Sequence, residues 1–425
     1  MNQKIKLYAS LSLLCLAPRL GCLFFHFRPE NLISFYWELS NGLLHNGTLS
    51  INGIKTTAFE PLYPLFLAST RWITGDHKFL VLIFQIVIGM IGCLYLYELG
   101  GLLARNKRVG LIASLLYSFY PYFIYQAGMI MEITLFATLL IISAYYYCKA
   151  SNLKNSIYCG IFFGLTILIR ATALPILLLG IGALVIRKSY REAFLVLSTS
   201  ILMLLPMAIR NYQIDGSFLL TRSGENLFDG NLEYSDKLIP AYNVDLLRPY
   251  VYGILEKERP DLIKGDRKKK DQFFTQKALQ FMIDHPWRTF RLKLKNIAYL
   301  FHPRLVPFYP MIEDSKLILE EAEGWRVENA GKRSFVKEFV HSFFYTFILL
   351  TALAGIYLRR KEARTDLILY LIALSFIVVY SLYFPTTRLR APMDFVLIFY
   401  SAYAIESFLK RLKISAWTQL NQNPT

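Results

Sequence analysis

The chain has 425 residues, of which 55% are apolar, 15% are aromatic and 18% are charged. Its mean hydropathy is +0.37, and apolar runs of about 20 residues recur, each long enough to cross roughly 30 Å of hydrocarbon. These values exclude soluble α/β enzymes, fibrous proteins and disordered regulators. The formal net charge of +17 would suggest nucleic acid in a soluble protein. Here the lipid bilayer explains it without nucleic acid as a partner.

Ten apolar segments predict membrane-spanning helices. Because a segment of this length can satisfy its own backbone hydrogen bonds in lipid only as a helix, we expect an all-α polytopic membrane protein. The first segment begins with basic residues and lacks a small-residue cleavage site, so we expect it to be retained as a helix. The approximate limits of the ten segments are 5–25, 79–103, 109–126, 130–148, 156–170, 173–187, 192–209, 338–358, 366–384 and 392–409.

Lysine and arginine are divided unequally between the two sets of loops. One set of loop ends carries 17 basic residues, and the short segments on the opposite side carry six. The positive-inside rule therefore predicts an inner or plasma membrane protein with both termini in the cytoplasm. The predicted organisation is an N-terminal transmembrane catalytic module over 1–209 with an outer loop at 26–78, a mainly helical extracytoplasmic segment over 210–337, and C-terminal transmembrane helices over 338–425.

The first outer loop predicts two amphipathic helices at the membrane surface. Between 31 and 45, apolar residues recur every three or four positions, at Leu32, Phe35, Tyr36, Leu39 and Leu43. A turn signal follows at Asn46-Gly47, and residues 62–74, with Pro61 near their start, indicate a second surface helix. Such a pair would form a lid or floor at the outer face.

Charged side chains gather at the predicted outer ends of the spans. An acid inside a membrane is costly and usually has a partner or a water-filled site, which marks Glu132 as a candidate. Arg170 also lies at an outer end and could pair with Glu132. Arg388 and Arg390 stand two positions apart, and on an extended segment they would point the same way. Anchoring to anionic headgroups is the alternative for these two. The cysteines and histidines show no metal-site spacing.

The first outer loop also resembles a known family. Its pattern Y-x-x-L-x-x-x-L-L-x-x-G, followed by P-x-Y-P-L-x-L-A, is similar to the first outer loop of GT-C glycosyltransferases. The similarity is greatest to bacterial enzymes like protein O-mannosyltransferases and aminoarabinose transferases. The matching residues are Tyr36, Leu39, Leu43, Leu44, Gly47, Pro61, Tyr63, Pro64, Leu65, Leu67 and Ala68.

Further matches follow in the family's order and extend the resemblance over nearly the whole chain. They are Tyr120-Pro121, the segment Met131 to Phe136, the segment Gly164 to Thr172, Leu205-Pro206, Arg210-Asn211-Tyr212, and Arg388, Arg390 and Pro392 before the last span.

This resemblance implies a glycosyltransferase that moves a sugar from a polyprenyl-phosphate donor to a membrane glycolipid, glycan or protein acceptor on the outer face, by direct displacement. Such chemistry needs a carboxylate for the acceptor hydroxyl, cations for the departing phosphate and an apolar groove for the prenyl chain. No cofactor is firmly implied, although acids and phosphate could share Mg²⁺ or Mn²⁺.

The family usually has an acid three or four residues before Tyr36, where this chain has Leu32 and Ile33. We therefore expect Glu30 or Glu60 as the catalytic carboxylate, with Glu38 as a further alternative. The residues expected to bind the donor phosphate are Arg388, Arg390, Arg210, Lys55 and Arg170. Those expected to position the substrate or the loop are Glu132, Tyr63 and Asn211.

Two other functions stay open from the sequence. A flippase for lipid-linked sugars would carry polar residues within its spans and inverted repeats. Here the charges gather at span ends instead, as expected of an enzyme at the membrane surface. A catalytically inactive assembly partner with the same fold is suggested by the displaced acid alone.

Overall fold

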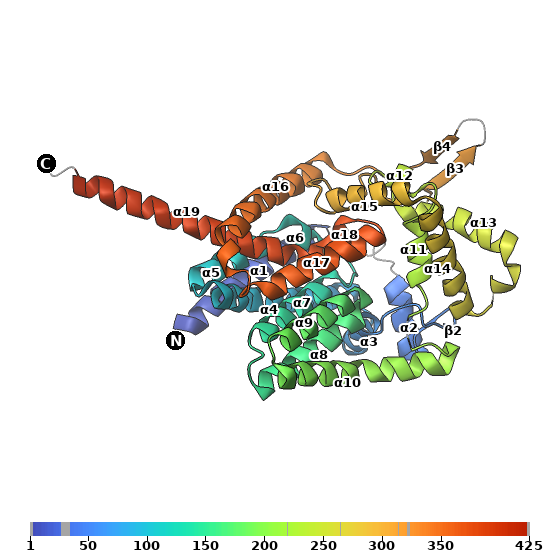
Figure 1. The fold of residues 1–425 in the computed structure, drawn as a ribbon, viewed down its shortest axis with the longest axis horizontal. Helices are drawn as coiled ribbons and strands as arrows, with labels where there is room; N and C mark the ends of the chain where they lie inside the picture. The colour runs from blue at the N-terminus through green and yellow to red at the C-terminus, as the bar shows by residue number, and fades with distance from the viewer. Residues whose placement is uncertain are drawn as a thin grey trace.

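Long helices lie side by side, and a segment of shorter helices covers one end of them (Figure 1). The structure is a computed structural model and describes residues 3–26, 35–218, 220–263, 265–312, 314–320 and 324–422. Helices α11 to α15 and the hairpin of β3 and β4 form the covering segment. Both chain termini lie at the opposite end of the molecule (Figure 1).

The predicted membrane region is helical, and the first outer loop adds a small hairpin. In chain order the elements up to the outer segment are α1 (Gln3–His26), α2 (Phe35–Asn46), β1 (Ser50–Ile51), β2 (Ile54–Lys55), α3 (Leu62–Thr74), α4 (Lys78–Ala104), α5 (Lys107–Ser118), α6 (Pro121–Gln126), α7 (Ile133–Cys148), α8 (Leu153–Ile169), η2 (Ala171–Ala173), α9 (Leu174–Ile186) and α10 (Tyr190–Asp215).

The outer segment is mainly helical, as predicted, and also contains one antiparallel hairpin, in which Lys316 pairs with Glu328. The remaining elements are α11 (Ser223–Asp229), α12 (Ser235–Leu238), η3 (Val244–Leu247), α13 (Arg248–Glu258), η4 (Pro260–Leu262), α14 (Arg267–Asp284), α15 (Pro286–Leu300), β3 (Lys316–Glu320), β4 (Gly324–Glu328), α16 (Phe335–Leu358), η5 (Arg360–Glu362), α17 (Leu367–Leu382), α18 (Thr387–Arg390), η6 (Ala391–Met393) and α19 (Asp394–Gln422).

Within the described residues, five helical stretches are long and apolar enough to cross a membrane by length and composition. They are Lys4–Phe25, Lys78–Ala104, Tyr190–Asp215, Phe335–Leu358 and Thr387–Leu412. Four shorter apolar helices, α7, α8, η2 with α9, and α17, coincide with further predicted spans. The count of ten spans stays a prediction.

The expected single span over 109–126 is wrong, because this stretch forms two helices, α5 and α6. Pro121 has no N–H to donate to a preceding turn, so the chain breaks at Phe119 and Tyr120 and a new helix begins at the proline. Arg19 of α1 is 1% exposed and satisfies the end of α5, donating to the carbonyls of Ser118 at 3.1 Å and Tyr117 at 3.2 Å.

The two helices expected in the first outer loop are present as α2 and α3, and one arginine joins them. Arg71 of α3 is 3% exposed and lies 4.1 Å above the Trp37 ring of α2. Its guanidinium donates to the carbonyl of Trp37 at 3.1 Å, the hydroxyl of Ser40 at 2.5 Å and the side chain of Asn41 at 2.7 Å. Because these bonds use most of the guanidinium donors, α2 and α3 pack as one unit.

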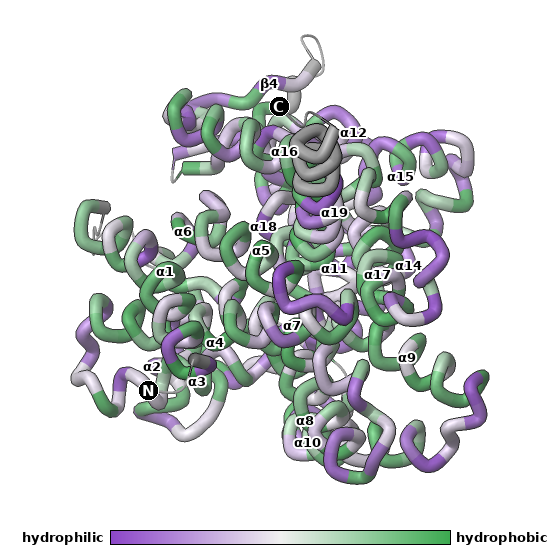
Figure 2. Tube along the Cα trace, turned by 90° about the vertical axis from the view of Figure 1, so that its left-hand side faces the viewer, coloured by the Kyte–Doolittle hydropathy of each residue, from purple (hydrophilic) through white to green (hydrophobic). Residues whose placement is uncertain are grey.

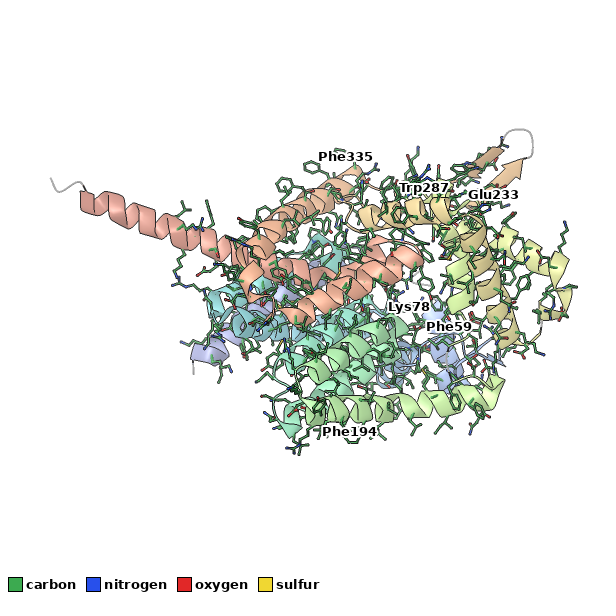
Figure 3. The ribbon with its side chains drawn as sticks, viewed as in Figure 1. Phe59, Lys78, Phe194, Glu233, Trp287 and Phe335 are labelled. Carbon is green, nitrogen blue, oxygen red and sulfur yellow. The ribbon has the colours of Figure 1, made fainter. Side chains whose placement is uncertain are left out.

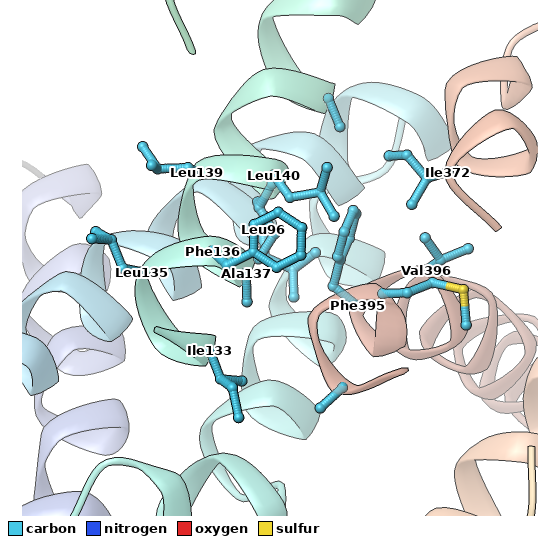
Figure 4. Packing of buried hydrophobic residues seen from close by; sticks show 14 of the residues in the cluster. Leu96, Ile133, Leu135, Phe136, Ala137, Leu139, Leu140, Ile372, Phe395 and Val396 are labelled. Carbon is cyan, nitrogen blue, oxygen red and sulfur yellow. The ribbon is translucent and has the colours of Figure 1, made fainter. Parts of the chain in front are cut away.

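Helix α7 lies at the centre of the main apolar core. Phe136 and Leu140 of this helix pack with Ile372 of α17 and Phe395 of α19 (Figure 4). Hydrophobic residues run along most of the long helices in Figure 2. Large apolar side chains also project outward, among them Phe194 and Phe335 (Figure 3), which are 68% and 80% exposed. Apolar surface on this scale is typical of contact with lipid.

The outer segment has a second apolar cluster of its own. Phe228 of α11 and Phe274 of α14 stack with ring centroids 5.7 Å apart, and Val251 and Leu255 of α13 belong to the same cluster. The division of the chain into three parts, at 209 and 337, stays a prediction.

Helices α16 and α19 approach each other closely at Gly355. A Cβ added there would lie 1.9 Å from the backbone carbonyl oxygen of Tyr400, so the helices would have to separate. We expect Gly355→Ala to lower the free energy of unfolding by about 1 to 3 kcal/mol, the usual cost of overpacking. Thermal unfolding in detergent measures this loss. Gly182→Ala is the matched control, because nothing lies within 4 Å of its added Cβ. Equal stability of the two variants would contradict this packing.

Candidate functional site

A cavity of about 1620 Å³ lies where the long helices meet the outer segment. Its wall includes residues of α2, α6, α10, α11 and the start of α16, together with the loops before α3 and α18. Apolar side chains such as Phe35, Ile124, Leu204 and Val340 make up much of the lining. A volume above the roughly 300–1000 Å³ of common ligand pockets leaves room for a large ligand or for two ligands.

A buried carboxylate organises one side of this cavity. Glu132 stands directly before α7 and is fully buried. Nη2 of Arg388 donates to its two oxygens at 2.9 and 3.0 Å, and Nη1 of Arg170 lies 3.4 Å from Oε1. Both arginines line the cavity, whereas Glu132 lies outside the described wall, so Glu132 anchors them from the protein interior. The expected pairing of Glu132 with Arg170 is present as this ion pair.

The Glu132 cluster presents net positive charge to the cavity, since two guanidinium groups share one carboxylate. Nε of Arg388 is buried and has no hydrogen-bond partner in the described part of the chain, and Nη1 of Arg170 is buried with only its 3.4 Å ion pair to Glu132. Such donors favour an anionic ligand with several acceptor oxygens, because an unpaired buried donor costs about 1–3 kcal/mol.

Glu60 places a second carboxylate in the cavity wall. It precedes Pro61 and α3, is half-buried, and accepts a hydrogen bond from the backbone N–H of Ala171 at 3.0 Å. Since Ala171 follows Arg170, one turn at the end of α8 positions both the carboxylate and a guanidinium. Burial raises the pKa of Glu60, and the Ala171 N–H and the Arg170 charge offset part of that rise.

Arg390 lies away from the cavity wall and inside the packing. It is fully buried, its ion pair with Asp394 measures 3.1 Å, and it donates to the carbonyls of Leu300 and His302 at 3.2 Å each. Its guanidinium also lies 3.7 Å from the Tyr345 ring centroid. These contacts use the guanidinium to hold α15, α16 and α19 together.

The expectation that Arg388 and Arg390 point the same way is wrong. The segment Thr387–Arg390 is the short helix α18, not an extended strand. Positions two apart on a helix are rotated by about 200°, so one side chain faces the cavity and the other faces the interior.

Arg210 and Asn211 join α10 to the first outer loop. Nη2 of Arg210 donates to the carbonyls of Leu49 at 3.1 Å and Thr56 at 2.9 Å, and Nη1 donates to the Asn211 side chain at 3.1 Å. Asn211 is 1% exposed. Neither residue belongs to the described cavity wall.

Lys55 and Tyr63 also lie outside the described cavity wall. Lys55 is exposed on β2. Tyr63 is 1% exposed, donates to Gln85 at 2.9 Å and packs edge-on against Tyr36 at 4.9 Å. Glu30 lies outside the described residues, as do Leu32 and Ile33.

Several cations of the cavity wall were not predicted from the sequence. They are Arg222, Arg248, Lys332, Arg333 and Lys337. Lys332 and Arg333 stand just before the span that begins at Phe335, so a basic pair at a span boundary was the available signal.

A divalent-cation site does not assemble from the residues that the structure describes. Among them, no group of three or more His, Cys, Asp or Glu could hold a metal ion. Arg388 engages both oxygens of Glu132, and Glu60 contributes one carboxylate to the cavity. Mg²⁺ and Mn²⁺ require more oxygen ligands than this.

Comparison with known proteins gives a matching family model and structures of the same fold. Residues 58–210 match the model of the dolichyl-phosphate-mannose-protein mannosyltransferases. The archaeal oligosaccharyltransferase AglB from Archaeoglobus fulgidus, in complex with an inhibitory peptide and a dolichol-phosphate, is 16% identical with a TM-score of 0.57. The alignment covers 100% of this chain and 53% of that chain, so this chain spans about half the length of the archaeal protein.

Two further structures extend the comparison. The Archaeoglobus fulgidus oligosaccharyltransferase in complex with Zn and sulfate is 13% identical, with a TM-score of 0.53 and coverage of 95% and 50% of the two chains. ArnT from Cupriavidus metallidurans bound to undecaprenyl phosphate is 14% identical, with a TM-score of 0.41 and coverage of 95% and 78% of the two chains. No curated protein matches the sequence. The resemblance to GT-C membrane glycosyltransferases is confirmed.

Replacing Arg390 should lower the stability of the protein more than replacing Arg388. Arg390→Gln leaves the buried Asp394 carboxylate without its cation, so we expect a loss of about 3 to 5 kcal/mol in the free energy of unfolding. Arg388→Gln is the matched control, because Glu132 keeps its ion pair with Arg170 and the Arg388 side chain is 34% exposed. Unfolding in detergent compares the two. A loss in Arg388→Gln as large as in Arg390→Gln would contradict the structural role of Arg390.

Proposed function

Since the chain has the fold of GT-C membrane glycosyltransferases, we propose that it transfers a sugar from a polyprenyl-phosphate donor to an acceptor at the outer membrane face. The observation that carries the proposal is the meeting of Glu60, Arg170 and Arg388 in one cavity. A proton acceptor and two cations are the groups that displacement of a sugar phosphate requires.

Glu60 is the proposed general base. It accepts the proton of the acceptor hydroxyl while the hydroxyl oxygen attacks the anomeric carbon. A pKa raised by burial suits this task, because a carboxylate that is a stronger base takes the proton more readily. The Ala171 N–H fixes one carboxylate oxygen and thereby orients the group.

Arg388 and Arg170 are the proposed ligands of the departing phosphate. As the bond from the anomeric carbon to the phosphate oxygen breaks, its electron pair moves to that oxygen, and the two guanidinium groups stabilise the charge. Because Glu132 already fixes Arg388 through two hydrogen bonds, little reorganisation is needed when the charge develops. Glu132 is thus a positioning residue.

The prenyl chain is proposed to lie between α1, α6 and α16. Cys22, Ile124, Val336 and Val340 give this part of the wall an apolar surface next to the exposed side of the helices. The archaeal structure of the same fold holds a dolichol-phosphate, which is a ligand of the proposed class. The acceptor, a glycolipid, glycan or protein, would enter beneath the outer segment.

The proposed orientation has both termini in the cytoplasm and the cavity at the extracytoplasmic face of an inner or plasma membrane. The excess of basic residues at one set of loop ends supports it. The location of both termini at the end opposite the outer segment (Figure 1) is consistent with it.

Replacing the proposed base should silence transfer. We expect Glu60→Gln to lower kcat by about 10² to 10⁴-fold, the usual contribution of a general base. Transfer of radiolabelled sugar from polyprenyl phosphate to a membrane glycolipid extract measures the loss. Glu38→Gln is the matched control, since Glu38 accepts the Asn52 N–H in the same loop and lies outside the described cavity wall. Full activity of Glu60→Gln with an inactive Glu30→Gln would assign the base to Glu30.

The activity should also depend on pH in a defined direction. The reaction needs ionised Glu60, and burial raises the pKa of this carboxyl. The acidic limb of kcat/KM should therefore have its midpoint above about 4.3, the ordinary value for glutamate. A pH profile of the purified protein measures it. A midpoint at or below that value would exclude Glu60 as the base.

A further inference from the structure

The cavity carries more positive charge than one phosphate requires. Its described wall holds seven basic side chains and two carboxylates, Glu60 and Asp245. Arg248 pairs with Asp245 at 2.9 Å. The basic residues are Arg170, Arg222, Arg248, Lys332, Arg333, Lys337 and Arg388. With Arg170 and Arg388 assigned to the donor phosphate, the cations at the start of α16 have no role in the proposed function.

Arg333 is the best placed of these cations. It is half-buried, and its Nη2 donates to the carbonyl of Pro307 at 2.7 Å, which fixes the guanidinium in the wall. Its Nε is buried and has no hydrogen-bond partner in the described structure. Lys337 lies in the first turn of α16, and its Nζ is 5.1 Å from the Tyr125 ring centroid on the same wall. The fixed Nε–H of Arg333, which lacks a partner, and the ammonium group of Lys337 are groups that bind an anion.

A buried histidine on the same wall has unused hydrogen-bonding capacity. His341 of α16 lines the cavity and is 2% exposed, and neither ring nitrogen has a partner among the described residues. The rings of Tyr345 and Tyr120 stack on it at 5.9 and 6.0 Å and hold its orientation. A buried polar side chain is normally satisfied, so an unsatisfied one at a cavity wall indicates a ligand or water.

Tyr122 of α6 connects this region with the donor-phosphate site. Its ring centroid lies 5.8 Å from that of His341, and it lines the same cavity as Arg388 and Arg333. His341 lines this cavity as well. The two groups of cations thus face one cavity.

We propose that Arg333, His341, Tyr122 and Lys337 form a second phosphate-binding subsite beside the Arg388 and Arg170 pair. This inference rests on the proposed function. The second phosphate comes either from a donor in which a diphosphate joins the lipid to the sugar, or from a phosphorylated glycolipid acceptor. In both cases Nε of Arg333 and a nitrogen of His341 gain the partner that they lack.

Binding of lipid phosphates to the full-length protein in neutral phospholipid nanodiscs tests the subsite. The probes are undecaprenyl phosphate, undecaprenyl diphosphate, and a phosphorylated glycolipid added with undecaprenyl phosphate already bound. We expect Arg333→Gln to weaken one of the last two by about tenfold or more, the effect of one lost charge-assisted hydrogen bond. Undecaprenyl phosphate should bind within about twofold of wild type. His341→Gln should weaken the same ligand as Arg333→Gln.

The control is Arg304→Gln, because Arg304 pairs with Glu338 at 2.6 Å near the start of α16 and lies outside the described cavity wall. Weaker binding of the diphosphate assigns the subsite to the donor, and weaker binding of the glycolipid assigns it to the acceptor. Equal weakening of all three probes, or of none, overturns the subsite. Arg388→Gln tests the proposed function separately. It should weaken the binding of undecaprenyl phosphate, which Arg333→Gln should leave unchanged.

Discussion

The cost of burying the Glu132 carboxylate constrains the whole site. An unpaired carboxylate in this environment would be several kcal/mol too costly, so the fold must supply cations to it. They come from the end of α8 and from α18, which stand 38 and 256 positions away in the chain. Once these elements meet at Glu132, the cavity wall, the turn that binds Glu60 and the start of the last helix are fixed relative to one another. The requirement of one buried charge thus defines where an anion can bind.

The sequence predicted the elements whose signals are local. Apolar length predicted most long helices, and Pro61 with its apolar periodicity predicted α3 with the limits that the structure has. The ion pair of Glu132 with Arg170 was predictable because both charges stood at the same expected membrane depth. Signals that depend on contacts between distant segments were out of reach. The hydrogen bond from Ala171 to Glu60 spans 111 positions, and nothing in the sequence near Glu60 announces it.

Arg388 and Arg390 show why residue type alone did not predict the site. The two are chemically identical and almost adjacent, and the sequence suggested the same role for both. A single turn of helix at α18 directs one toward the cavity and the other toward Asp394. The basic residues at the start of α16 show the converse. Lys332 and Arg333 stand at the predicted outer boundary of a span, where the positive-inside rule expects few cations, and only the cavity gave this basic pair a chemical context.

The junction that Arg71 makes between α2 and α3 has a consequence for how the protein works. A loop between two spans is often a mobile flap that closes over its substrate and loses conformational entropy when it becomes ordered. Here the guanidinium ties both helices into one body, and Glu60 stands at the entrance to α3. The position of the Glu60 carboxylate is therefore set by helix packing that is present before any ligand binds. Adaptation to different acceptors would fall to the outer segment, while the reacting groups keep a constant geometry.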